Sequence, residues 1–154
     1  MNRVTKLAIV KEIKSILKAN EISYKINLKS HQCYSHPFDK FIYLGFASPE
    51  YKSRNAMLSA LFHELGHIVN YQTKKYFLYH QTEILNKKSV KYAIQHGLKA
   101  EQHTDLIGQK LMKKYDPKAR FHPTYNKPEM KKRYKEEYLT KLISLIKPNN
   151  NDNF

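Results

Sequence analysis

The feature that most constrains this sequence is an apolar stretch, Ser53–Tyr71, that carries two histidines four residues apart. The stretch has no proline, is rich in strong helix formers and is apolar on nearly every side, which is typical of a buried helix. In a helix, residues four apart lie one above the other, so His63 and His67 can direct their rings to one point. The spacing favours a metal site; the alternative is a pair of core histidines hydrogen-bonded to backbone or carboxylate groups.

Glu64 follows the first of these histidines directly. Zinc binds neutral imidazole nitrogens at about 2.0–2.1 Å, and a catalytic zinc site keeps a position open for water. A glutamate one residue from a ligating histidine is angled toward that water rather than toward the ion. The pattern therefore predicts a general base beside an activated water.

The run His63-Glu64-Leu65-Gly66-His67 resembles the active-site helix of gluzincin-like zincin metallopeptidases, which include small ImmA/IrrE-type and HtpX-type proteins of bacteria and phages. The resemblance implies that His63 and His67 bind Zn2+. It also implies that Glu64 is the catalytic base of peptide-bond hydrolysis.

A second long helix is predicted over Val90–Tyr115, where polar residues recur at steps of three and four along one face. Small side chains dominate the opposite face, which would allow the HExxH helix to approach closely. This stripe consists of Ala93, Gly97, Ala100, Thr104, Gly108 and Leu111. We therefore expect the third metal ligand to come from this helix.

Two residues compete for the role of third ligand. Glu101, with Asp105 one turn later, is similar to the third-ligand motif of HtpX-type peptidases, which implies that Glu101 binds zinc and Asp105 hydrogen-bonds a ligating histidine. The residues between them depart from that motif, which often has a second acid and an alanine there. His96, followed by Gly97, resembles the third ligand of SprT-type proteins. Glu101 is our preferred assignment, and the choice stays open at this point.

Downstream, Arg120–Tyr125 is a proline-punctuated loop. Zincins commonly take an oxyanion-stabilising side chain from such a loop, so the resemblance makes His122 and Tyr125 candidates for this role. The alternative is an ordinary connecting loop.

The chain before the histidine pair predicts a helix and two strands. Val4–Ala19 has a helical apolar stripe that includes Val4, Leu7, Ile13 and Leu17, and this helix should pack on a sheet. Ile22–Leu28 and Phe41–Phe46 have the character of strands, and Ser30–Asp39 between them is typical of a turn or loop. Ser48-Pro49-Glu50 has the composition of a helix start.

These elements predict one α+β domain over residues 1–147. Their order, helix, strand, strand, HExxH helix and second ligand helix, resembles that of a small zincin-like fold. In such a fold the edge strand can pair with an extended substrate. Pro128–Lys147 is expected to form a last basic amphipathic helix, and residues 148–154 a disordered tail.

The formal charge of +15 comes mainly from lysines spread along the whole chain. It is compatible with a nucleic acid, an anionic membrane surface or an acidic protein as partner, but compositional drift toward lysine explains it as well. Arginine, the usual base-reading residue, occurs only at Arg3, Arg54, Arg120 and Arg133, which argues against sequence-specific recognition of nucleic acid.

A single cysteine excludes an intramolecular disulfide, and no apolar run has the length of a signal-peptide core or a membrane span. These features predict a cytoplasmic protein without a transmembrane segment. The sequence as a whole predicts a zinc metallopeptidase with His63, His67 and Glu101 as ligands and a protein or peptide substrate. The alternatives are a basic, non-catalytic binding or regulatory protein on a zincin-like scaffold, and a structural zinc site.

Overall fold

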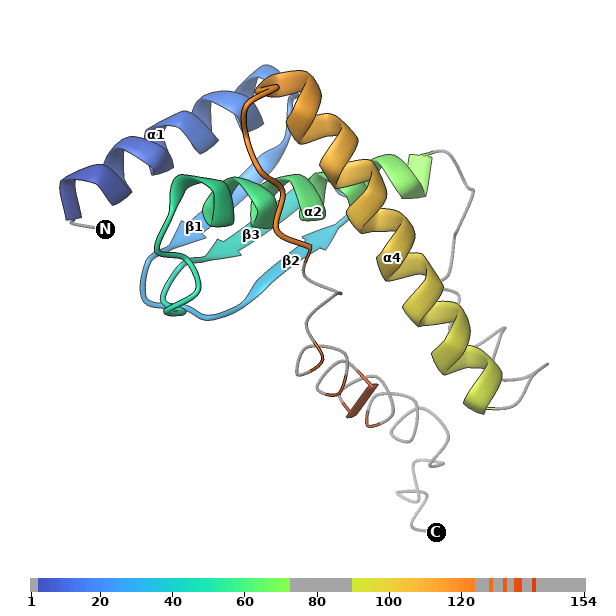
Figure 1. Cartoon of the computed structure of the whole chain (residues 1–154). Helices are drawn as coiled ribbons and strands as arrows, with labels where there is room; N and C mark the ends of the chain where they lie inside the picture. Colours follow the sequence, from blue (N-terminus) through green and yellow to red (C-terminus); the bar gives the residue numbers. More distant parts are fainter. Residues whose placement is uncertain are drawn as a thin grey trace, which may run out of the picture.

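The computed structural model of the chain describes residues 3–72 and 90–123 and the single positions 128, 132, 135, 136 and 140. The expected tail 148–154 and nearly all of the helix expected over Pro128–Lys147 therefore lie outside the described residues. The elements, labelled in Figure 1, are α1 (Arg3–Ala19), β1 (Ser23–Asn27), β2 (Cys33–His36), β3 (Phe41–Gly45), α2 (Arg54–Gln72) and α4 (Val90–Tyr115). None of the described helices has the length and apolar character needed to cross a membrane.

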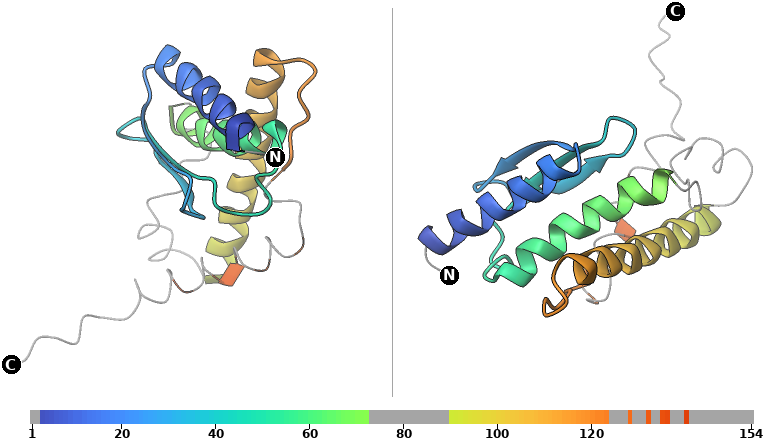
Figure 2. Two further views of the ribbon diagram at one scale, coloured as in Figure 1. Left: turned by 90° about the vertical axis from the view of Figure 1, so that its left-hand side faces the viewer. Right: turned by 90° about the horizontal axis from the view of Figure 1, so that it is seen from above.

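The described elements stack in three layers, with the sheet at one side, α1 and α2 in the middle and α4 at the other side (Figure 2). α2 packs against α1, β2, β3 and α4, whereas the backbone of α4 packs closely against no described element except α2. The HExxH helix therefore forms the centre of the molecule, and most of its residues are buried. This position explains why its sequence is apolar on nearly every side.

The sheet has the order β1-β3-β2, so the last strand in the chain is the central one. β1 runs parallel to β3 and β2 runs antiparallel to it. The connection from β1 to β2 crosses the end of β3 at Gly45, where a Cβ atom would lie 2.6 Å from the carbonyl oxygen of Ser30. Only glycine leaves room for this crossing.

The expected loop over Ser30–Asp39 is wrong in part, because it contains strand β2. The fold thus has three strands before the HExxH helix instead of two, although the mixed helix-and-sheet class is as expected. β2 has only four residues and lies at the edge of the sheet, so just Cys33 and Ser35 turn inward. With no run of apolar residues at alternate positions, the strand gives no sequence pattern to detect.

The predicted helix start at Ser48-Pro49-Glu50 is also wrong. These residues form a turn, in which the Ser48 hydroxyl donates to Glu50 Oε1 (3.1 Å) and the N–H of Tyr51 donates to the Ser48 carbonyl (3.1 Å). α2 begins at Arg54, and the Ser53 hydroxyl caps it by accepting the N–H of Ala56 at 3.1 Å. Both Ser48 and Ser53 could have capped this helix, and Ser53 is the residue that does so.

The first turns of α1 are more exposed than its apolar stripe predicted. Val4 is 77% and Leu7 43% exposed, whereas Ile13 and Leu17 are fully buried. The reason is visible in Figure 1, where the N-terminal end of α1 extends past the sheet and α2. The buried part of the helix packs as expected.

An ion-pair cluster joins α1 to the start of α2 and to the end of α4. The Arg54 guanidinium donates two hydrogen bonds to the Glu12 carboxylate (2.6 and 2.9 Å) and one to Asp116 (2.7 Å). Tyr115 adds a hydrogen bond to Glu12 at 3.0 Å. Since α1 and α4 share no packing contact, these groups form the described link between them.

Candidate metal centre

Close packing of α2 against α4 builds the site. A Cβ atom at Gly66 would lie 2.7 Å from the carbonyl oxygen of Thr104, and one at Gly108 would lie 2.7 Å from the carbonyl oxygen of Phe62. Ala100 and Thr104 are buried in the same interface. The expectation that the small-residue stripe of the second helix admits the first is confirmed for its described members.

Three side chains from these two helices converge on one point. Nε2 of His63 and Nε2 of His67 are 3.1 Å apart, and Oε2 of Glu101 lies 3.3 Å from the first and 3.5 Å from the second. Among the described residues, His63, His67 and Glu101 form the one group of three with ligand atoms placed to hold a metal ion. The structure thus brings together the three residues that the sequence singled out as ligands.

The three separations match those required by zinc. Ligand atoms at about 2.0–2.1 Å from a tetrahedral ion are about 3.3 Å from one another, close to each of the three distances above. Two imidazole nitrogens and one carboxylate are also a donor set that catalytic zinc sites use, with the fourth position left for water or substrate. The residues present therefore fit a zinc ion.

Asp105 fixes the orientation of His63. Nδ1 of His63 donates to Oδ1 of Asp105 at 2.7 Å, and both side chains are buried. Burial lowers the pKa of His63, but hydrogen bonds to Asp105 and Glu101 outweigh it and hold the pKa well above its usual value. Because Asp105 holds the proton on Nδ1, loss of the proton on Nε2 leaves the Nε2 lone pair facing the site, which is the tautomer a metal ligand needs.

Glu101 is held as a carboxylate despite its burial. Burial alone raises the pKa of Glu101, but the charge of His67 and hydrogen bonds from His63 and His67 bring it well below its usual value. A cation bound between these groups would replace the protons that the histidines share with the carboxylate. Metal binding is thus expected to release protons.

Thr104 contacts one of the ligand histidines, a role that the sequence did not predict. Its hydroxyl lies 3.4 Å from Nδ1 of His67 and 3.4 Å from the side-chain nitrogen of Asn70, and the residue is fully buried. It supports the second histidine at a longer distance than Asp105 supports the first. The only signal was its place one residue before Asp105, on the face of the helix that carries the ligands.

Glu64 is buried, and it lies close enough to Cys33 and Tyr51 for its charge to act on both. Burial raises the pKa of the Cys33 thiol to about 11, and the charge of Glu64 adds to this rise. Burial likewise raises the pKa of Tyr51, again with a contribution from Glu64. Glu64 therefore lies between the ligand face of α2 and the edge strand β2, which contains Cys33.

The remaining candidates have different outcomes. The backbone N–H of His122 donates to the Ser59 hydroxyl at 2.9 Å, which places the loop after α4 one helical turn before His63. The His122 side chain is exposed and is not in the ligand cluster. The side chain of His96 and the whole of Tyr125 lie outside the described residues, so their proposed roles stay predictions.

Comparisons with protein-family models, with curated proteins and with solved structures find no match to this chain. The functional argument therefore depends on the geometry of the site itself.

Proposed function

We propose that this protein is a zinc-dependent metallopeptidase of the gluzincin type. The observation that carries the proposal is the buried triangle of His63, His67 and Glu101, with edges of 3.1, 3.3 and 3.5 Å. Its dimensions and donor set suit zinc, and Asp105 orients one ligand as in other histidine-carboxylate metal sites.

Glu64 supplies the proton transfers of the proposed reaction. When bound, zinc supplies Lewis acidity, which polarises a peptide carbonyl and makes water a nucleophile near neutral pH. Glu64 accepts the proton of that water as oxygen attacks the carbonyl carbon, and then gives it to the departing amine nitrogen. The products are a free carboxylate and a free amine.

The edge of the sheet offers a place for the substrate backbone. Among the described strands, β2 pairs only with β3, so no described strand pairs with its other edge. An extended peptide can add to such an edge as a further strand. Because the charge of Glu64 acts on Cys33 of β2, a peptide bound along this strand would pass near the general base.

Metal analysis provides the first test. We expect one zinc per chain after reconstitution with zinc and removal of loosely bound ions, and none in His63→Ala or Glu101→Ala. The exposed His36→Ala serves as the matched control and should keep the metal. Wild-type protein that stays metal-free under these conditions would overturn the proposal.

The second test separates chemistry from metal binding. Glu64→Gln should keep one zinc and the wild-type fold but lose cleavage of a fluorescently labelled unfolded protein, because the amide cannot accept a proton. Glu50→Gln removes an exposed carboxylate close by in sequence and should remain active. Undiminished cleavage by Glu64→Gln would assign the base to another residue.

A further inference from the structure

The outer face of the sheet, turned away from the helices, carries aromatic rings. Directly paired residues share a face, so the register places Phe41 and Tyr43 of β3 beside His36 and Tyr34 of β2. On the other side, Lys25 of β1 pairs with Tyr43. These five residues are called the aromatic face below.

The rings contact one another across the strands. Tyr34 and Tyr43 are stacked with ring centres 4.9 Å apart and an interplanar angle of 3°. The His36 ring lies edge-on to Tyr34, with ring centres 5.4 Å apart, and is tilted against Phe41, with ring centres 6.0 Å apart. The side-chain nitrogen of Asn27 donates to the Tyr43 hydroxyl at 3.1 Å, which further fixes that ring. The aromatic side chains of this face are thus held in fixed positions by contacts with one another.

This face is accessible in the described part of the protein. Ile42 and Leu44, which alternate with Phe41 and Tyr43 along β3, are fully buried toward the helices, so the rings point the opposite way. Tyr34 is 39% exposed, and His36 is exposed as well. Cross-strand pairing explains the stacking of two tyrosines, but a solvated sheet face has no need of four aromatic rings.

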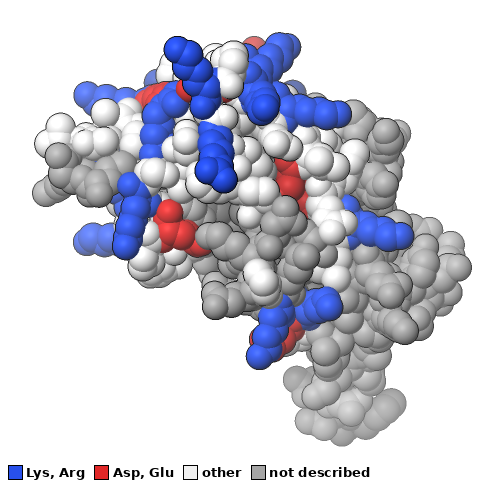
Figure 3. Space-filling view, viewed as in Figure 1, with Lys and Arg blue, Asp and Glu red and all other residues white. Residues whose placement is uncertain are grey.

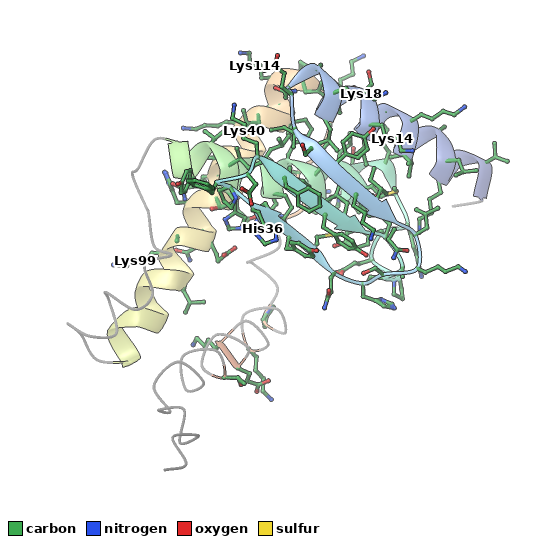
Figure 4. All side chains as sticks on the ribbon, turned by 180° about the vertical axis from the view of Figure 1, so that it is seen from behind. Lys14, Lys18, His36, Lys40, Lys99 and Lys114 are labelled. Atoms are coloured by element: carbon green, nitrogen blue, oxygen red, sulfur yellow. The ribbon has the colours of Figure 1, made fainter. Side chains whose placement is uncertain are left out.

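Lys25 belongs to the aromatic face, and further lysines lie on the elements beside it. Figure 4 looks onto the sheet from behind and labels Lys40 in the turn before β3 and His36 on β2, together with Lys14 and Lys18 on α1, the helix that packs behind β1. The exposed carboxylates of Glu21 and Asp39 lie in the adjoining turns, so the local excess of positive charge is moderate. The opposite side of the molecule also carries Lys and Arg, which stand mainly along its upper border (Figure 3). The aromatic rings therefore distinguish the sheet face more than the charge does.

We propose that the aromatic face binds a single strand of nucleic acid, with bases against its rings and phosphates near its lysines. Base stacking on aromatic side chains in a positively charged surface is the means by which proteins hold single strands without reading their sequence. A duplex keeps its base faces stacked internally and cannot use the rings. The scarcity of arginine agrees with binding that tolerates any sequence.

Binding of a fluorescent oligothymidylate of about 15 nucleotides, within the site sizes known for such surfaces, tests the proposal. Tyr34→Ala should weaken binding about 5- to 100-fold, whereas Tyr34→Phe, which keeps the ring, should bind as the wild type does. A thermal melt should show that Tyr34→Ala remains folded, because Tyr34 belongs to an exposed edge strand.

A pair of lysine variants tests the location of the charge contacts. Lys25→Ala should weaken binding and reduce the slope of log affinity against log salt by about 0.7, the value for one phosphate of a single strand. Lys52→Ala removes the same charge from the exposed loop before α2 and should have a smaller effect. All of these variants should keep one zinc, and Glu64→Gln should bind the oligonucleotide normally, so this proposal and the peptidase proposal can fail separately.

Four outcomes would overturn the inference. They are no binding near 0.1 M salt, equal affinity for a duplex of the same length, equal losses in Lys25→Ala and Lys52→Ala, and a dimer that Tyr34→Ala converts to a monomer. The last result would mean that the aromatic face pairs two copies of the chain.

Discussion

The two sides of α2 carry different kinds of side chain. Toward α4 the helix presents Gly66 and the histidines, and its backbone approaches the other helix closely enough to exclude a methyl group. Toward the sheet it presents large aliphatic side chains such as Leu61 and Ile68, which are buried in the main core. The side toward α4 fixes the distances between the metal-ligand atoms, and the side toward the sheet removes apolar surface from water. We therefore expect metal affinity and global stability to respond to different substitutions on the same helix.

The largest effect on stability is expected from the sheet side. Leu61→Ala removes a fully buried side chain and should lower the free energy of unfolding by about 2–5 kcal/mol. Urea denaturation measures this loss, and metal analysis of the folded fraction should still give one zinc per chain. If zinc is lost while the protein remains folded, the two sides of the helix are not independent.

On the other side, Asp105→Asn should reduce zinc affinity about 10- to 100-fold, because His63 loses the charged partner that orients its ring. Competition with a chromogenic chelator measures the change, and the exposed Asp39→Asn is the matched control. Thr104→Val should have a smaller effect, since its hydroxyl is 3.4 Å from His67 rather than 2.7 Å. Equal effects of the two substitutions would contradict the unequal support of the two histidines.

Gly66→Ala tests the close contact between the helices. At an open helical position, alanine would stabilise the protein by about 1 kcal/mol relative to glycine. Here the added Cβ meets the Thr104 carbonyl oxygen at 2.7 Å, so we expect a net loss of about 1–2 kcal/mol together with weaker zinc binding. A stabilised Gly66→Ala protein with unchanged zinc affinity would show that the interface adjusts without cost.

The smallest expected effect is at the ion-pair cluster of Arg54, Glu12 and Asp116. Arg54→Met should cost about 1 kcal/mol at pH 7, because partly exposed ion pairs are screened by water. Hydrogen bonds from Arg54 lower the pKa of Glu12 and of Asp116. The contribution is therefore present above about pH 5 and is lost as the pH falls through the folded-state pKa values.

Urea denaturation of Arg54→Met and of the wild type at pH 7 and near pH 3 measures this dependence. The difference in unfolding free energy should be largest at pH 7 and clearly smaller at the acidic pH, where the carboxylates begin to be protonated in the folded state. A difference that does not change with pH would assign the effect to lost packing of the arginine side chain.

The sequence predicted the parts of the fold that have a strong helical period. The second ligand helix begins at Val90 and ends at Tyr115 as expected, and Glu101, which the resemblance to HtpX-type peptidases favoured over His96, lies beside His63 and His67. Periodicity works for α1 and α4 because each has one buried face over several turns, whereas α2 was expected from an apolar stretch without proline.

What the sequence did not predict depends on tertiary contacts. Strand β2 is short and polar, so its place at the sheet edge is decided by pairing with β3 rather than by its own residues. The role of Thr104 depends on the rotation of His67, which no spacing rule specifies. The cytoplasmic location and the substrate class stay predictions.

The strand order also has a consequence for how the chain folds. β2 and β3 are neighbours in sequence and form an antiparallel hairpin across a short turn, so they can pair early, on the microsecond timescale of hairpins. β1 precedes both strands but pairs only with β3, so it has no partner among the strands until that hairpin exists. During synthesis, β1 must therefore wait for the residues of β3 to leave the ribosome, and the ligand triangle closes only after Glu101 has followed. We expect the sheet to grow from the β2–β3 hairpin, with β1, the earlier strand in the chain, added to it afterwards.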